Sequence, residues 1–139
     1  MVLQGYNATS LRDIARTARI PVGSLYYHFP TKEELFEAVY EEGVHRLTRF
    51  VEDAIVEASN PLDRLQRACA AHLRPICDGD DFTVAIPTRI PDISDRARRT
   101  IAALNSGYEL IFKRFINDLT LPSEVSTPLL RLQILGALN

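Results

Sequence analysis

Residues 5–36 read GYNATSLRDIARTARIPVGSLYYHFPTKEELF, and this stretch decides the fold expected for the whole chain. Ser10, with Asp13 three residues later, matches the capping-box pattern, in which both side chains satisfy backbone amides at a helix start. The apolar positions that follow recur at helical spacing on one face: Leu11, Ile14, Ala15 and Ala18. The pattern therefore predicts a helix over residues 11–18.

A second, short helix is predicted directly after the first. Pro21 is tolerated in the first turn of a helix and disfavoured inside one, so the helix starts near Pro21 or Val22. It runs to Tyr27, because the tripeptide at 28–30 ends in proline and stops it. Two short helices joined by about three or four residues are typical of a helix-turn-helix.

The remainder of the chain also reads as helical, because glycine is scarce and no segment sustains period-two alternation. Thr31 with Glu34 begins a long helix whose apolar stripe reaches Ala58, before Asn60-Pro61 breaks it. The next stripe is Leu62, Leu65, Cys69, His72, Leu73 and Ile76. Further helices are expected after Asp92 or Ser94 to about 119 and over about 129–138, with a short one limited by prolines over 82–91.

The predicted fold class is all-α, with a helix-turn-helix head and an antiparallel helical body. The hydrophobic share of 46% and the charged share of 24% are ordinary for a soluble globular protein. No apolar run approaches the ~20 residues of a membrane span, and no secretory leader is visible. Cys69 and Cys77 would lie about 12 Å apart on one helix, too far for a disulfide. Two free thiols indicate a reducing, cytoplasmic location.

The net charge of −2 does not by itself indicate a nucleic-acid partner, but the charges are unevenly distributed. In residues 1–32 a single acid, Asp13, accompanies the basic residues Arg12, Arg16, Arg19 and Lys32. Residues 33–42 carry five glutamates and no basic residue. Positive charge is therefore confined to the N-terminal module, as a phosphate-facing patch requires, although a solvated face would look the same.

The stretch from Gly5 to Leu35 resembles the DNA-binding domain of the TetR (tetracycline-repressor) family. The matching positions are Gly5-Tyr6, Thr9-Ser10, Ile14-Ala15, Ala18, Ile20, Gly23-Ser24-Leu25-Tyr26, His28-Phe29, Lys32 and Leu35. So many fixed spacings are specific, whereas a tight pair of helices alone is common. The resemblance implies a homodimer that binds a double-stranded, pseudo-palindromic DNA operator and responds to a small-molecule effector, most simply as a repressor.

Ten residues are predicted to meet DNA: Thr9, Ser10, Arg12, Val22, Gly23, Ser24, Tyr26, Tyr27, His28 and Lys32. Hydroxyls and amides at a helix N-terminus can hold phosphate, although simple capping explains Ser10 as well. Two adjacent tyrosines in one helix cannot both face one core, so at least one is exposed. The resemblance implies DNA contact for both tyrosines and a phosphate contact for Lys32. Leu25 and Phe29 should instead pack inward.

The sequence departs from the family at both ends. The first helix of the family precedes Gly5-Tyr6, and only residues 1–4 stand there, so the head is predicted to lack most of that helix. Four apolar residues would then lack partners: Tyr6, Leu11, Ile14 and Leu25. The body of the family ends in two long helices that pair across a dimer, and residues 129–138 resemble the start of the first. The predicted domains are 1–45 for DNA binding and 46–139 for ligand binding and dimerisation, with an incomplete end.

Five residues of the body are candidates for lining an effector pocket: Cys69, His72, Tyr108, Phe112 and Phe115. Aromatic stripes at this spacing also occur in plain helical cores. The segments Tyr108-Glu109 and 135–139 look similar to family members that respond to acyl-CoA-like or other hydrophobic metabolites. The basic run Arg96 to Arg99 is either a solvated face or a patch for an acidic ligand.

No metal site, cofactor or enzymatic activity is predicted. Cys69, His72 and Cys77 lack the paired spacing of metal ligands and read as a helix face. Neither a nucleophile-elbow motif nor a phosphate loop is present. The alternative to a DNA-binding regulator is a helical ligand-binding or scaffold protein that does not bind DNA.

Overall fold

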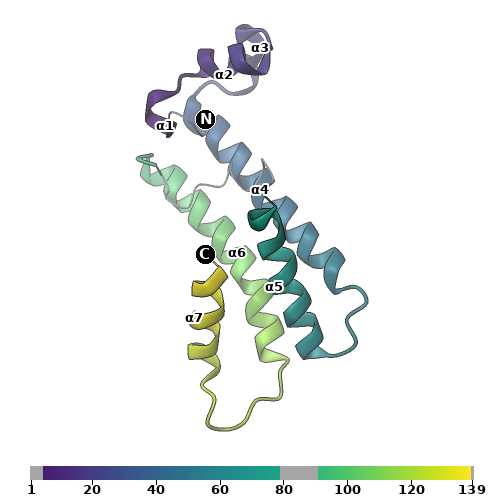
Figure 1. The fold of residues 1–139 in the computed structure, drawn as a ribbon. Helices are drawn as coiled ribbons and strands as arrows, with labels where there is room; N and C mark the ends of the chain where they lie inside the picture. Colours follow the sequence, from purple (N-terminus) through teal and green to yellow (C-terminus); the bar gives the residue numbers. More distant parts are fainter. Residues whose placement is uncertain (1–4, 79–90, 139) are drawn as a thin grey trace.

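The computed structural model describes residues 5–78 and 91–138, and every regular element in these ranges is a helix. Figure 1 shows the helices, which are α1 (Gly5–Ala8), α2 (Leu11–Ala18), α3 (Val22–His28), α4 (Lys32–Ile55), α5 (Pro61–Cys77), α6 (Asp95–Asn117) and α7 (Thr127–Leu138). The predicted all-α class is confirmed. The short helix expected over 82–91 falls almost entirely outside the described residues.

The helix starts follow the capping residues that the sequence indicates. Ser10 and Asp13 form a complete capping box at α2, while the Thr31 hydroxyl accepts from the Glu34 amide at 3.1 Å to begin α4. Of the two candidates for α6, Ser94 is the cap. Arg19 ends α2 in the left-handed conformation, with φ of 57°, and its amide donates to the Ala15 and Arg16 carbonyls. This turn is what allows α3 to follow so closely.

Helices α1, α2 and α3 form a head at one end of the long α4 (Figure 1). Its small core consists of the buried residues Leu11, Ala15 and Leu25, with Ile14, Phe29 and Leu35 packed against them. The expectation that Tyr6, Leu11, Ile14 and Leu25 would lack partners is therefore wrong. The reason is that α2 and α3 bury their apolar faces against each other and against Leu35 at the start of α4, while Tyr6 packs on Phe36.

The body consists of α4, α5, α6 and α7, with α5 running antiparallel to α4 and α6, and α7 antiparallel to α6 (Figure 1). Its core has two clusters. One, nearer the head, contains Phe36, Tyr40, Val44, Ile93, Ala97 and Ile101, and the other contains Val51, Leu65, Ala68, Phe112, Phe115 and Ile116. Helix α4 begins at the head and supplies side chains to both clusters of the body. One continuous helix therefore joins the head to the body.

The buried face of α5 differs in part from the apolar stripe that the sequence predicts. Leu65 and His72 are buried as expected, but Leu62 and Leu73 are exposed and Ala68 is buried in their place.

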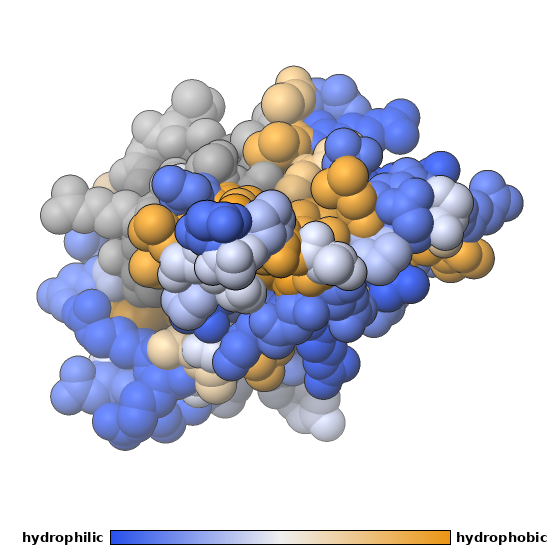
Figure 2. All heavy atoms as spheres, turned by 90° about the horizontal axis from the view of Figure 1, so that it is seen from below, coloured by the Kyte–Doolittle hydropathy of each residue, from blue (hydrophilic) through white to orange (hydrophobic). Residues whose placement is uncertain are grey.

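The lower end of the molecule in Figure 1, opposite the head, presents hydrophobic residues in its middle with hydrophilic residues around them (Figure 2). No helix in the described ranges is both long enough and apolar enough to cross a membrane.

Candidate nucleic-acid interface

The outer face of α3 carries the predicted DNA-reading residues. Tyr27 is 83% exposed and Tyr26 is 43% exposed, so both rings lie on the surface of a coiled segment. Leu25 is only 6% exposed and faces α2, as predicted. The adjacent rings of Tyr27 and His28 lie edge to face with 5.1 Å between centroids. Val22 and Ser24 are also exposed. This orientation leaves one whole side of α3 available to a partner.

Gly23 lies in the first turn of α3. A Cβ built at this position would meet no atom within 4 Å, so packing in the described chain does not require glycine here. The missing side chain would instead let an external partner approach the α3 backbone closely.

The start of α2 is already occupied by a carboxylate of its own chain. The Ser10 amide and hydroxyl both donate to the Asp13 carboxylate, at 3.1 and 2.5 Å, and Arg16 pairs with Asp13 at 2.7 Å. These hydrogen bonds from Ser10, with a smaller contribution from Arg16, lower the pKa of Asp13. Ser10 therefore acts as the cap of α2, and Arg12 on the same helix is exposed.

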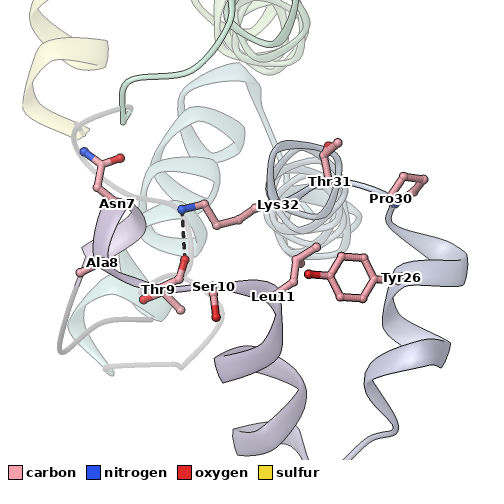
Figure 3. Close-up of a pocket in the computed structure, with 9 residues that line it drawn as sticks. All are labelled: Asn7, Ala8, Thr9, Ser10, Leu11, Tyr26, Pro30, Thr31 and Lys32. Carbon is pink, nitrogen blue, oxygen red and sulfur yellow. Dashed lines mark hydrogen bonds between the residues drawn. The ribbon is translucent and has the colours of Figure 1, made fainter.

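A hollow of about 430 Å³ brings four of the predicted residues together (Figure 3). Thr9 and Ser10 line it from the connection between α1 and α2, Tyr26 from α3, and Lys32 from α4. Five further lining residues were not predicted as site residues, namely Asn7, Ala8, Leu11, Pro30 and Thr31. Leu11 had a signal in the apolar stripe of its helix and Thr31 had one in its capping pattern, whereas Asn7, Ala8 and Pro30 had none. The hollow therefore brings the α1–α2 connection, α3 and the start of α4 together in one depression.

Lys32 lies in this hollow, but its ammonium is engaged within the head. Its Nζ donates to the Tyr6 carbonyl at 2.8 Å and to the Thr9 carbonyl at 3.0 Å. The same atom lies 4.2 Å from the centroid of the Tyr6 ring. Thr9 is itself buried, whereas the neighbouring Ser10 is exposed.

The five residues predicted to line an effector pocket meet between α5 and α6. The His72, Tyr108 and Phe112 rings are in mutual contact, with centroids 5.6 to 6.0 Å apart, and Phe115 contacts Phe112 at 6.3 Å. His72 Nδ1 and the Tyr108 hydroxyl are hydrogen-bonded at 2.8 Å. Cys69 is half-buried at the edge of the same cluster. The arrangement is an aromatic core with one polar pair inside it.

Burial determines the ionisation of Tyr108 and Cys69 in this cluster. Desolvation, with a smaller electrostatic contribution from Cys69, raises the pKa of Tyr108 far above its ordinary value. Desolvation also raises the pKa of the Cys69 thiol. Both groups are therefore neutral at physiological pH, and they offer hydrogen bonds rather than charge. No three potential metal ligands cluster anywhere in the described ranges.

The N-terminal end of α6 is bonded to the first turns of α4, a feature that sequence reasoning missed. The Ser94 amide and hydroxyl donate to the two carboxylate oxygens of Glu33 at 2.8 and 2.6 Å. Arg96 donates to both oxygens of Glu37 at 2.7 and 3.3 Å. Arg98 pairs with Asp92 at 2.9 Å. Two arginines of the basic run over residues 96–99, Arg96 and Arg98, thus have acidic partners within the chain.

These observations agree with comparisons with known proteins. Residues 1–39 match the family model described as "Bacterial regulatory proteins, tetR family". The chain is 41% identical over 63 residues to the HTH-type transcriptional repressor KstR2 of Mycobacterium tuberculosis, a match that covers 45% of this chain and 32% of KstR2. It is 28% identical over 115 residues to the HTH-type transcriptional repressor DhaR of Mycobacterium sp. strain GP1, covering 81% of this chain and 58% of DhaR. The matched part of the chain thus spans about a third of the length of KstR2 and somewhat over half of the length of DhaR.

Solved structures extend the likeness to the whole fold. The TetR-family regulator PfmR of Thermus thermophilus superimposes with a TM-score of 0.80 at 27% identity, covering 98% of this chain and 76% of PfmR. AibR, solved with isovaleryl coenzyme A and operator DNA, gives a TM-score of 0.82 at 21% identity, covering 99% of this chain and 76% of AibR. The motif in residues 5–36, the outward α3 and these likenesses lead to one assignment: residues 1–39 carry the N-terminal domain of the tetR family of bacterial regulatory proteins.

Proposed function

We propose that this chain is the DNA-binding and effector-responsive part of a transcriptional repressor. The observation that carries the proposal is α3, which presents Tyr26 and Tyr27 outward while Leu25 fixes its inner side against α2. A helix held by its apolar side and bare on its polar side can enter a major groove of DNA. We assign residues 1–45 to DNA binding and 46–139 to ligand binding and dimerisation, with α4 common to both.

The exposed residues of the head divide by chemistry. Tyr26, Tyr27, His28 and Ser24 offer hydroxyl and ring donors to base edges, and Val22 offers an apolar contact to a thymine methyl. Arg12 is exposed on α2, where it can reach a phosphate or a guanine edge. Thr9 and Ser10 contribute mainly by shaping the hollow that they line with Tyr26.

The effector would bind in the body, beside the aromatic cluster of α5 and α6. AibR was solved with isovaleryl coenzyme A, and FadR of Bacillus subtilis, another structural neighbour, with stearoyl-CoA. A mostly apolar cluster that contains the hydrogen-bonded pair His72–Tyr108 suits a hydrophobic or acyl-type molecule that carries a hydrogen-bonding group. A movement of α6 would be transmitted to the start of α4, next to the head, through the hydrogen bonds to Glu33 and Glu37.

The working unit is proposed to be a homodimer in the cytoplasm. Leu129 and Leu132 on α7 are 56% and 63% exposed, an apolar surface that a second copy could cover. Two such heads would bind half-sites about 34 Å apart, in successive major grooves. Cys69 and Cys77 are free thiols, which suits a reducing compartment. We propose no catalytic role.

DNA binding itself can be tested without knowing the operator. The full-length protein is incubated with a random-sequence duplex pool, and bound duplexes are amplified and sequenced over several rounds. Enrichment of a pseudo-palindromic sequence, with affinity that decreases as salt increases, is expected. No enrichment and no salt-sensitive binding would instead favour a helical ligand-binding or scaffold protein. The Tyr26→Ala variant should lose about 1–3 kcal/mol of affinity for the enriched duplex.

A further inference from the structure

Lys32 occupies the first position of α4, where a cation is poorly placed, because the N-terminal end of a helix is the positive end of its dipole. Its ammonium instead reaches the carbonyl of Tyr6 in α1 at 2.8 Å and that of Thr9, directly after α1, at 3.0 Å. It also lies over the face of the Tyr6 ring. Carbonyls at a helix end and aromatic faces are both negative, so they form a favourable site for a cation.

This contact fixes the connection between α1 and α2. Thr9 directly precedes Ser10, the cap of α2, so holding the Thr9 carbonyl holds the point where α2 begins. The Tyr6 ring beneath the ammonium packs edge to face on Phe36, one turn along α4, with 5.2 Å between centroids. Lys32 and Phe36 together therefore bind the α1–α2 connection to the first turns of α4.

The position of α3 depends on the same connection. Leu25 packs against Leu11 and Ala15, so α2 and α3 move as a unit. That unit is attached to α4 through residues 29–31, through Leu35 packed on its core, and through the carbonyls that Lys32 holds. Loss of the Lys32 contact would release the α1–α2 connection and let α2 and α3 shift relative to α4.

We propose that Lys32 is a positioning residue for the recognition surface, and that this role outweighs any contact with a DNA phosphate. Two of its three N–H groups already have acceptors in the head, and its side chain is half-buried. This role rests on the proposed DNA binding, and it makes Lys32 the residue that orients the DNA-binding helix α3. A phosphate contact stabilises binding to every sequence through counterion release, whereas orientation of α3 affects only sequence-specific contacts.

The two roles differ in a salt titration. Lys32→Met keeps most of the apolar stem and removes the charge and the donors. Binding is measured by fluorescence anisotropy on two labelled duplexes of equal length, one enriched by the wild-type protein and one of shuffled sequence. A positioning role lowers affinity for the enriched duplex about tenfold, changes that for the shuffled duplex less than about twofold, and leaves the salt slope unaltered. An equal loss on both duplexes, with a slope reduced by about one, would overturn the inference.

A double-mutant cycle tests whether Lys32 acts through Tyr6. Tyr6→Leu removes the ring beneath the ammonium, and Tyr6→Phe is the matched control because it retains the ring. Lys32→Met should weaken enriched-duplex binding far less in the Tyr6→Leu background than in the wild type, and Tyr6→Phe should bind within about twofold of the wild type. Additive losses would contradict a shared role.

Hydrogen exchange without DNA separates failure of this inference from failure of the proposed function. In Lys32→Met, amides of residues 9–13 should exchange faster while those of α5 and α6 keep their wild-type protection. Unchanged exchange at residues 9–13 would overturn the role of Lys32 even if DNA binding is intact. A wild-type protein that enriches no duplex would overturn the proposed function, and the positioning role with it.

Discussion

The Ser94 hydroxyl donates to one carboxylate oxygen of Glu33 at 2.6 Å, and the Ser94 amide donates to the other at 2.8 Å. Glu33 thus lies at the N-terminal end of α6, where a negative charge is favoured. Its neighbour in the chain is Lys32, whose ammonium donates to the Tyr6 and Thr9 carbonyls. Two adjacent residues of α4 therefore connect the start of α6 in the body to the head, each through its own hydrogen bonds.

The Glu33–Ser94 contact should make stability depend on pH in the acid range. Hydrogen bonds from Ser94, followed by the charge of Arg96, lower the pKa of Glu33. A lowered folded-state pKa contributes stability that is present above the ordinary carboxyl pKa and is lost as pH falls through the folded value. The urea midpoint of the wild type should exceed that of Glu33→Gln at pH 7, and the difference should shrink below about pH 4.

Glu41→Gln is the matched control, since Glu41 is an exposed carboxylate on the same helix. It should follow the wild type across the pH range. A Glu33→Gln midpoint that runs parallel to the wild type down to acid pH would show that the Ser94 contact contributes no pH-dependent stability.

Tyr27 should contribute to DNA affinity and not to the stability of the fold. Its ring is 83% exposed, so Tyr27→Ala should change the free energy of unfolding by less than about 0.5 kcal/mol. Affinity for the enriched duplex should decrease by about 1–3 kcal/mol if the ring or hydroxyl reads a base. Val56→Ala, a second exposed apolar truncation (78%) beyond the far end of α4, should affect neither quantity. Unaltered DNA affinity of Tyr27→Ala would remove Tyr27 from the interface.

Leu25 should have the opposite profile. Its side chain is 6% exposed in the small core of the head, and Leu25→Ala leaves a cavity that costs about 2–5 kcal/mol. Because the head has few other buried residues, we expect its amides to lose exchange protection while α5 and α6 keep theirs. Leu62→Ala, at a residue 55% exposed, is the control and should be nearly silent. Loss of protection throughout the molecule would show that head and body unfold together.

Tyr108 should make the protein sensitive to alkali. Burial, and to a smaller extent the Cys69 thiol, raises the pKa of Tyr108, so its stabilising contribution is complete below about pH 10 and is lost at higher pH. The urea midpoint of the wild type should therefore decrease more steeply above pH 10 than that of Tyr108→Phe. At pH 7 the variant should be less stable by about 1 kcal/mol, because the hydrogen bond to His72 is lost.

The exposed Tyr27→Phe is the control for this titration and should follow the wild-type curve. If Tyr108→Phe and the wild type lose stability in parallel above pH 10, Tyr108 ionises in the folded state as freely as an exposed phenol.

Local signals made much of the fold predictable. The Ser10–Asp13 box and the Thr31 cap fix helix starts through residues three apart, so sequence reasoning placed α2 and α4 correctly. The outward position of Tyr26 and Tyr27 followed from their adjacency in a helix whose Leu25 packs inward. Specific contacts between distant segments were less predictable.

Two features show why. Lys32 could reach solvent, phosphate or the carbonyls of Tyr6 and Thr9, and only the three-dimensional path of α1 decides among them. On α5, helical spacing allows more than one apolar stripe, so the burial of Ala68 in place of Leu62 depends on where α4 and α6 lie. The candidate effector residues were brought together as expected, but their role stays a prediction.

Helix α4 runs unbroken from Lys32 to Ile55, about 36 Å, and works geometrically as a lever. A tilt of about five degrees at one end moves the other by about 3 Å, close to the rise of one base pair. In a dimer of the kind proposed, the body then sets the distance between the two copies of α3, while the residues of the head set the base sequence that is recognised. Grafting a foreign head onto this helix should alter the sequence recognised and preserve the half-site spacing.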